Sequence, residues 1–417
     1  MNVIWLVNMI LPDIARHLEL NVNPFGGWLD GLSKEFHNSN SVKLHILFPQ
    51  NISDDTVVEN IDNITYIGYN LKSKNVKFEF RRILNSTDFD VIHIFGTEYK
   101  NAFYLTEIAR EIGKLSKIVV SIQGLISVYS KYYYADLPIK IIHHKTVYEI
   151  IRRNNIFMSR EKLTKRGIYE TKILENVTKV IGRTQWDFAC IKAINPDLIY
   201  YKCNESLRDG FYLKTWSLEK CKKFSIFISQ GNYPIKGLHI LLEALKIVIN
   251  KFPLLTVKIA GDNIIKNNDI ILGFKKSTYA EYLKTKIIRY KLQNNIVFTG
   301  VLSEIEVINT LLSSHVFISP SSIENSPNSV GEAMIMGVPT ISSYVGGVTS
   351  LMNPNNEGLY YPFNDSELLA FQIMRIFNDD KLARYLSTNA RVKASLTHDR
   401  NKNYNDLISI YSGIQNE

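Results

Sequence analysis

Residues Ser319 to Pro339, SPSSIENSPNSVGEAMIMGVP, combine the end of a strand, a polar loop and the start of a helix. The apolar run that begins at His315 is typical of a buried parallel strand. A loop of Ser, Asn and Pro follows, and a helical pattern then begins near Pro327 and stops at Gly337. The pattern therefore places the loop at the carboxyl end of a strand, where doubly wound sheets bind ligands.

Two carboxylates flank this loop, Glu324 within it and Glu332 on the predicted helix. The backbone N–H groups at a helix N-terminus favour anions, because they lack intrahelical partners and lie at the positive end of the helix dipole. Acceptors for sugar hydroxyls thus stand beside donors for phosphate, which suits a nucleotide sugar. The polar residues between the two carboxylates are Asn325, Ser326, Asn328 and Ser329.

The Glu-x7-Glu spacing, the Gly337-Val338-Pro339 that follows and the later Val345-Gly346-Gly347 resemble the retaining glycosyltransferases of family 4. Two Glu residues at this spacing are by themselves usually a solvated helix face, whereas the surrounding Ser, Pro, Asn and Gly frame is specific. The resemblance covers nearly the whole chain and is strongest from Lys236 to Gly347. It implies an α/β protein of the GT-B fold, with two Rossmann-like domains facing a cleft and a C-terminal helix that returns to the first domain.

Length and composition agree with two globular domains. The chain has 417 residues, 45% of them hydrophobic and 21% charged, enough for two domains of about 200 residues each. No run approaches the roughly 20 apolar residues that a membrane span needs. The first residues lack a basic region and are interrupted by Pro12 and Asp13, so they predict a β-strand and not a signal peptide. We therefore expect a cytoplasmic protein, either free or at the inner face of the membrane.

Neither a metal site nor a disulfide is indicated. The three cysteines show no C-x-x-C spacing. Asp88-Phe89-Asp90 has the D-x-D pattern that holds a metal in other transferases, but it directly precedes a predicted strand at Val91 to Phe95 and is interpreted as the end of a loop. We expect a metal-independent enzyme with no cofactor besides its nucleotide-sugar donor.

Strands and helical patterns alternate along both halves, which favours parallel sheets of Rossmann type. We place an acceptor-binding domain at residues 1–212 and a nucleotide-sugar-binding domain at 213–395. Residues 396–417 are predicted to form the helix that packs back on the first domain.

The resemblance implies roles for residues of the second domain. Lys236, in Lys236-Gly237, matches the family's lysine at the donor diphosphate, whereas Gly231 stands where relatives have an arginine. Glu324 is expected at the donor sugar or its developing charge, and Glu332 at the ribose hydroxyls. The remaining donor contacts expected by resemblance are the four polar residues between the carboxylates, the glycines Gly346 and Gly347, and Val297 in a strand beside the nucleobase.

The first domain is expected to supply the phosphate and acceptor side of the cleft. Gly26 and Gly27 follow the first strand, where glycine permits close approach of a ligand to backbone amides. Gln123 stands where many family members have a histidine, and it can hydrogen-bond a sugar hydroxyl but cannot act as a base. Arg183, at another strand end, is predicted either to contact phosphate or to form a structural ion pair.

Residues 129–172 are rich in Tyr, Lys, Arg and His, and their apolar residues recur at spacings compatible with an amphipathic helix. Such a face could lie on an anionic membrane, bind an acceptor diphosphate or be an ordinary solvated surface. Nucleic acid is not expected, because no recognised nucleic-acid motif accompanies the charge.

The resemblance implies a retaining hexosyltransferase. Its donor would be a UDP- or GDP-sugar, and its acceptor a lipid-linked or polysaccharide molecule in capsule, O-antigen or lipopolysaccharide synthesis. The alternatives are a GT-B epimerase or hydrolase acting on a sugar nucleotide, and a non-catalytic protein that binds one. A nicotinamide-dependent dehydrogenase is disfavoured, because no G-x-G-x-x-G follows the first strand.

Overall fold

The computed structural model describes residues 1–22, 27–37, 41–52, 56–70, 76–261, 263 and 277–416. Its contacts divide the chain into two compact units. Unit 1 comprises Met1–Val128, Lys165–Arg208 and His398–Glu417, and unit 2 comprises Tyr129–Thr164 and Asp209–Thr397.

Unit 1 is built on an eight-stranded sheet, as far as the structure describes the chain, with the order β3-β4-β2-β1-β5-β6-β7-β8. Among the described strands of this sheet, only β3 runs antiparallel to its neighbour, and the other pairs are parallel. The strands are β1 (Asn2–Leu6), β2 (Lys43–Gln50), β3 (Val57–Ile61), β4 (Ile64–Asn70), β5 (Val91–Phe95), β6 (Ile118–Ser121), β7 (Lys179–Gly182) and β8 (Ile199–Lys202).

The central strands of unit 1 read as continuous apolar runs because helices cover both faces of the sheet. Residues Val3 to Leu6 and the whole of β5 are buried. The helices of this unit are α1 (Pro12–His17), α2 (Gly27–Lys34), α3 (Val76–Ser86), α4 (Lys100–Glu111), η2 (Leu115–Lys117), α9 (Gln185–Ile194) and α18 (Arg400–Gln415). Two more, α5 (Ile126–Tyr132) and α8 (Ile156–Asn176), cross the border between the units in sequence.

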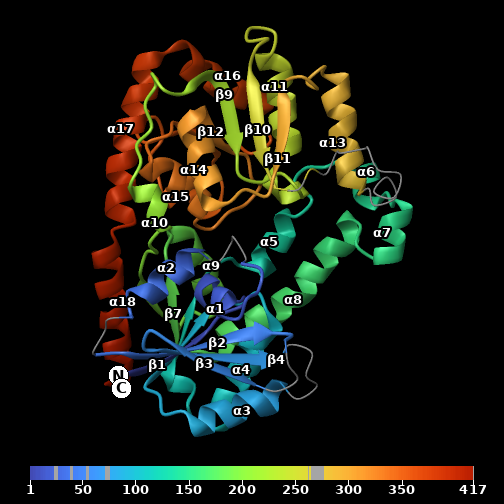
Figure 1. Cartoon of the computed structure of the whole chain (residues 1–417). Helices are drawn as coiled ribbons and strands as arrows, with labels where there is room; N and C mark the ends of the chain where they lie inside the picture. The colour runs from blue at the N-terminus through green and yellow to red at the C-terminus, as the bar shows by residue number, and fades with distance from the viewer. Residues whose placement is uncertain are drawn as a thin grey trace. The chain divides into compact units, whose positions relative to one another are not determined.

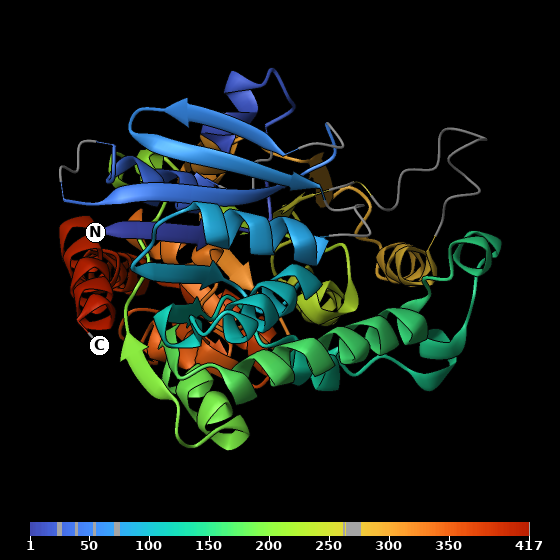
Figure 2. The same cartoon turned by 90° about the horizontal axis from the view of Figure 1, so that it is seen from below.

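The C-terminal helix α18 belongs to unit 1, as predicted. Its Leu407, Ile410 and Tyr411 lie in one buried cluster with Trp5 of β1. The Trp5 Nε1–H donates to the Tyr411 hydroxyl over 2.9 Å, so the last helix is tied to the first strand by a buried hydrogen bond. In Figures 1 and 2 both ends of the chain lie on the same side of unit 1.

Unit 2 carries a six-stranded sheet in the part of the chain that is described, with the order β11-β10-β9-β12-β13-β14 and parallel pairing throughout. The central strand β12 is buried along its whole length. The strands are β9 (Lys222–Ile228), β10 (Thr256–Ala260), β11 (Ile296–Gly300), β12 (Ser314–Ser319), β13 (Thr340–Ser343) and β14 (Leu359–Tyr361).

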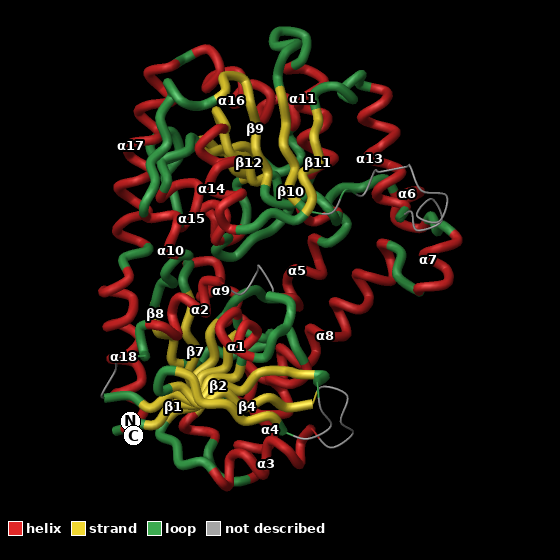
Figure 3. Tube along the Cα trace, viewed as in Figure 1, coloured by secondary structure: helices red, strands yellow, loops and turns green. Residues whose placement is uncertain are grey.

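Helices surround this second sheet, as Figure 3 shows in red. They alternate with the strands along the chain, so unit 2 is also an α/β layer structure with its core on both sheet faces. The helices are α6 (Ile139–His143), α7 (Val147–Arg152), α10 (Asp209–Tyr212), η3 (Pro234–Lys236), α11 (Leu238–Val248), α13 (Thr278–Arg289), α14 (Glu304–Ser313), α15 (Asn328–Ile335), η4 (Gly346–Ser350), α16 (Ser366–Asn378) and α17 (Asp380–Thr397).

Two details differ from the sequence interpretation. Residues 129–164 group with unit 2, whereas we placed them in a continuous domain of residues 1–212. The amphipathic pattern within 129–172 is also interrupted, because α6 ends at His143 and α7 begins at Val147. Thr146 and Glu149 form a capping box that starts a new helix there. Within the described residues, no helix has the length and apolar character required to span a bilayer.

Candidate functional site

The polar loop after β12 lies where the sequence places it. β12 ends at Ser319 and α15 begins at Asn328, with Pro327 as its N-cap residue. The loop is buried against its own unit: Ser322 N donates to Ile235 O over 2.8 Å, and Ser343 Oγ donates to Ser321 O over 2.5 Å. These bonds hold the segment that carries Glu324 in one conformation.

Lys236 and Glu324 form the central ion pair of unit 2. Lys236 Nζ lies 2.6 Å from Glu324 Oε1, and the two side chains are 23% and 12% exposed. Burial opposes the charge of the lysine, but the Glu324 carboxylate outweighs it and raises the pKa of Lys236. Lys236 is therefore a protonated ammonium group with part of its surface open to a ligand.

A second donor also reaches the Glu324 carboxylate. Ser321 Oγ donates to Glu324 Oε1 over 2.7 Å, so the same oxygen that faces Lys236 accepts two hydrogen bonds. Because the hydroxyl and the ammonium group both hold this oxygen, the carboxylate is oriented before any ligand arrives.

Two glycines make this arrangement sterically feasible. Gly237 has φ +68°, and a Cβ there would lie 1.7 Å from the Pro320 carbonyl oxygen. Gly346 has φ +49°, and its Cβ would lie 2.1 Å from the Glu324 carbonyl oxygen. Both positions require glycine, because a side chain would strike backbone atoms and the left-handed conformation is strained for other residues.

The predicted glycine pair Gly346-Gly347 therefore contacts the loop directly. Gly347 N donates to the Glu324 carbonyl over 2.9 Å. This amide fixes the backbone of the residue whose side chain pairs with Lys236. We had expected the pair to present amides to the donor, and in the structure the amide of Gly347 is engaged by Glu324.

The other predicted donor residues occupy the loop and the start of α15. Asn325, Ser326 and Glu332 are buried, and Asn328 and Ser329 are half-buried at the helix N-terminus. Glu332 is the fifth residue of α15, so its carboxylate and the first amides of the helix belong to the same short segment. The structure thus brings acidic, amide and hydroxyl groups together at the carboxyl end of β12.

Gly231 and Val297 lie outside this cluster. A Cβ on Gly231 would lie 2.8 Å from Leu238 Cδ2 and 3.3 Å from Ile259 Cγ2, so apolar groups fill the space next to this glycine. Val297 lies on the edge strand β11, with β10 and β9 between it and β12, and its side chain is half-exposed.

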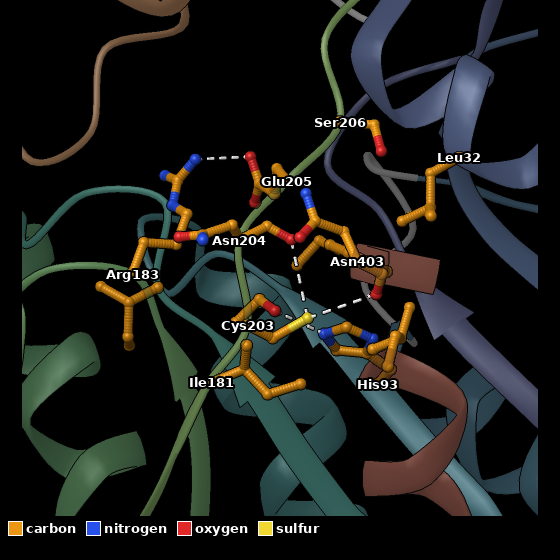
Figure 4. A pocket seen from close by; sticks show the side chains of 13 residues that line it. Leu32, His93, Ile181, Arg183, Cys203, Asn204, Glu205, Ser206 and Asn403 are labelled. Atoms are coloured by element: carbon orange, nitrogen blue, oxygen red, sulfur yellow. Dashed lines mark hydrogen bonds and ion pairs between the residues drawn. The ribbon is translucent and has the colours of Figure 1, made fainter. Parts of the chain in front are cut away.

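Unit 1 contains a second polar cluster, centred on a residue that we did not predict. Gln123 Nε2 donates to Glu205 Oε1 over 2.6 Å, and Arg183 Nη1 lies 2.5 Å from Glu205 Oε2. Figure 4 shows the Arg183 guanidinium group turned toward the Glu205 carboxylate. The ion-pair interpretation of Arg183 is therefore the one that the structure shows. The sequence signal for Glu205 was its position in a polar stretch after β8.

This cluster borders a small pocket within unit 1. Glu205 is half-buried, with 11% of its side chain exposed, and the loss of solvation raises the pKa of its carboxyl group, which the Arg183 charge partly counteracts. Arg183 Nε is buried and has no hydrogen-bond partner among the described residues. The pocket wall includes Arg183, Glu205, Asn204 and Ser206, so it presents both donors and acceptors to a small polar group.

His93 lies below this pocket as a core residue. Its Nδ1 is 2.5 Å from the Tyr411 hydroxyl and its Nε2 is 2.6 Å from Ser121 Oγ. Burial lowers the pKa of His93 to about 3, so the ring is neutral.

Gly27 begins α2, and a Cβ on it would lie 2.8 Å from Arg208 Cδ. Its predicted neighbour Gly26 lies outside the described residues.

Asp88 and Asp90 make structural contacts at the start of the sheet. Asp90 Oδ2 accepts from Asn2 N over 2.8 Å, and Asp88 Oδ2 accepts from Asn2 Nδ2 over 3.2 Å. A search of the described residues finds no group of three or more His, Cys, Asp and Glu side chains arranged to hold a metal ion.

Comparison with known proteins identifies the unit that carries the Lys236–Glu324 pair. Residues 213–393 match the family described as glycosyl transferases group 1. This group 1 domain thus contains β9 to β14, the loop after β12 and both glycines of the site.

Two curated relatives are named as glycosyltransferases. YtcC of Bacillus subtilis is 23% identical over 336 residues, which cover 80% of this chain and 74% of the relative. WcaL of Escherichia coli, named for colanic acid biosynthesis, is 26% identical over 175 residues, which cover 40% of this chain and 39% of the relative.

Solved structures extend the likeness from the group 1 domain to the rest of the chain. HepE of Anabaena, determined in complex with UDP-glucose, superimposes with a TM-score of 0.68 at 14% identity. The alignment covers 99% of this chain and 100% of HepE. At this identity the likeness shows the fold alone. The predicted GT-B fold is confirmed.

Proposed function

We propose that the chain is a retaining glycosyltransferase of family 4 that transfers a hexose from a UDP- or GDP-sugar to a lipid-linked or polysaccharide acceptor. The observation that carries this proposal is the Lys236–Glu324 pair at the carboxyl end of β12, inside a group 1 domain. The names of the relatives add support: one solved neighbour is a complex with UDP-glucose, and one curated relative is named for polysaccharide biosynthesis.

Lys236 is assigned to the leaving group. When the bond between the anomeric carbon and the phosphate oxygen breaks, the electron pair leaves with the nucleoside diphosphate, whose charge increases. A protonated lysine and the amides at the start of α15 can stabilise that charge. Because Gly231 adds no charge and is packed among aliphatic groups, Lys236 has a larger share of this task. We propose that no metal ion is required.

Glu324 is assigned to the donor sugar, and Glu332 to the ribose hydroxyls. A carboxylate can accept hydrogen bonds from two neighbouring hydroxyl groups. The acceptor oxygen bonds to the anomeric carbon on the face that the phosphate leaves, and its proton passes to the departing diphosphate. The configuration at that carbon is then retained.

The acceptor is assigned to unit 1. The charge of Arg183 is paired with Glu205, and Gln123 shares the same carboxylate. Such a neutralised cluster suits the hydroxyl groups of a sugar better than it suits a second phosphate. We further propose that the protein works in the cytoplasm at the inner face of the membrane, where residues 129–172 contact anionic lipid during synthesis of a cell-surface glycan.

Donor binding tests this proposal first. The purified chain is heated with UDP-, GDP- and ADP-sugars, and a bound donor raises the melting temperature because it binds only the folded state. We expect sugar donors with one of the three nucleobases to raise the melting temperature. The same donors should raise it less in the Glu332→Ala variant. Equal melting temperatures with all donors and without them would contradict the proposal.

Treatment with EDTA tests whether transfer requires a metal ion. We expect the rate of transfer to be unchanged by it.

A further inference from the structure

The short helix α7 presents an aliphatic face to solvent. Val147, Ile150 and Ile151 are 68%, 59% and 75% exposed. Their i, i+3, i+4 spacing places them on one side of the helix. Ile139 at the start of the neighbouring α6 is 76% exposed. Apolar side chains that are grouped on one face and left in water mark an interaction surface.

The opposite side of α7 is anchored within unit 2. Glu149 is buried, and its carboxylate accepts from Thr278 N over 2.9 Å and from Thr278 Oγ1 over 2.5 Å. Thr146 N also donates to Glu149 Oε2 over 3.0 Å. Figures 1 and 2 show α6 and α7 beside α13, which begins at Thr278. These bonds fix the helix so that its aliphatic face is directed away from α13.

The exposed charges between Leu137 and Phe157, which flank this face in the sequence, have one sign. Between Leu137 and Phe157 the sequence has four basic side chains and one acid, and that acid is the buried Glu149. The four basic residues are all exposed: Lys140, Lys145, Arg152 and Arg153. Exposed aliphatic side chains bordered by lysine and arginine are the composition of a helix that lies in the interface of an anionic bilayer.

We propose that α6 and α7 form a membrane contact, in which the α7 face enters the interfacial region and the basic residues bind anionic headgroups. This inference deepens the proposed function, because it gives the membrane of a lipid-linked acceptor a defined contact surface on unit 2. The contact itself requires neither donor nor acceptor.

The test measures binding to sedimented vesicles without any sugar nucleotide. Vesicles of equal parts phosphatidylglycerol and phosphatidylcholine are compared with vesicles of phosphatidylcholine alone. We expect binding to the anionic vesicles only. The double variant Ile150→Ser/Ile151→Ser should weaken it at least about tenfold, because two isoleucines no longer leave water. Lys140→Glu/Lys145→Glu should weaken it most at low salt, where charges are least screened.

Matched controls use equally exposed residues elsewhere in unit 2. Leu254→Ser/Ile305→Ser removes aliphatic side chains that are 84% and 71% exposed. Lys251→Glu/Lys381→Glu reverses two exposed charges. Both controls should bind vesicles as the unsubstituted chain does. If the serine variant of α7 melts early, Val147→Ser alone gives the same comparison.

Two results would overturn the inference. One is equal vesicle binding by all variants. The other is a dimer in solution that Ile150→Ser/Ile151→Ser dissociates without any vesicle binding, which would make the face a protein interface. The proposed function fails or holds separately, because Glu332→Ala should bind the donor more weakly and keep full vesicle binding.

Discussion

Lys236 Nζ and Glu324 Oε1 are 2.6 Å apart although 88 positions separate the two residues in the chain. The lysine comes from η3, which follows β9, and the glutamate from the loop after β12. β9 and β12 are parallel neighbours, so their carboxyl ends meet at one edge of the sheet. The pairing of β9 with β12 therefore brings the two side chains together. The glycines at positions 237 and 346 leave room for the loops that carry them.

Replacing Lys236 with alanine should remove the charge that we assign to the leaving group. We expect the turnover rate to fall by about 10²- to 10³-fold, which is typical of losing one electrostatic stabiliser of the transition state. The melting temperature should fall by a few degrees at most, because Ser321 still donates to Glu324.

The control for this variant is Lys286→Ala, which breaks the ion pair with Glu243 between α13 and α11 of unit 2. Initial rates and thermal melts of both variants provide the comparison. Equal turnover in the two variants would refute the role of Lys236.

Gly346→Ala should displace the loop. The added Cβ would meet the Glu324 carbonyl at 2.1 Å, and the residue has φ +49°. We expect a loss of about 1–3 kcal/mol in unfolding free energy, because strained backbone is introduced, and a loss of donor binding. Gly413→Ala is the control, since its Cβ would meet nothing within 4 Å and it lies in α18. Urea titrations measure both; a Gly346→Ala protein as stable as Gly413→Ala would argue against the steric reading.

Tyr411→Phe should loosen the C-terminal helix. The hydroxyl accepts from Trp5 Nε1 and lies beside His93 Nδ1, and all three groups are buried. Its removal leaves buried polar atoms unpaired, at a cost of about 1–3 kcal/mol. Tyr385→Phe removes an exposed hydroxyl that bonds Asn356 and should change stability by less than about 0.5 kcal/mol. Equal unfolding free energies for the two variants would contradict the buried-network account.

Acid should destabilise the fold through four buried histidines. Burial lowers the pKa of His93 to about 3, and those of His239, His315 and His398 to about 4. Below pH 6.5 the unfolded chain binds protons that the folded chain does not, so stability is present above that pH and is lost as pH falls toward 4. Each such histidine contributes a slope of about 1.4 kcal/mol per pH unit.

Urea unfolding at pH 7, 6 and 5 measures this slope. His315→Phe keeps an aromatic ring stacked on Phe377 and removes one titrating group, so its stability should depend less on pH. A stability that is level from pH 7 to pH 5 would show that these histidines are protonated in the folded chain.

The sequence predicted those features of the fold that depend on short stretches or on a repeated pattern. The strand before Glu324, the helix after it and the alternation of strands with helices all depend on patterns within a few residues of one another. β12 and α15 begin and end within a residue or two of the predicted positions. Lys236 and Glu324 were each expected at the donor only through the family resemblance, and their ion pair was not predicted, because the two residues follow separate strands.

The rest depends on contacts that no local pattern contains. Glu205 gains its role from Gln123 and Arg183, which sheet order brings to it from two other strand ends. Residues 129–164 join unit 2 through bonds such as that from His239 Nε2 to Ala135 O and those between Glu149 and Thr278. The start of α7, in contrast, was visible in the sequence as Thr146 and Glu149, a capping box that we overlooked.

The central claim is tested most directly by measuring nucleoside diphosphate release with and without an acceptor. The unsubstituted chain is incubated with the donor found by thermal shift, in the presence and in the absence of a polyprenyl-diphosphate-linked sugar. We predict that release depends on the acceptor and is accompanied by a glycosylated product that retains the anomeric configuration. Release that is equal without the acceptor would instead indicate a hydrolase or an epimerase, and donor binding with no release under any condition would indicate a non-catalytic binding protein.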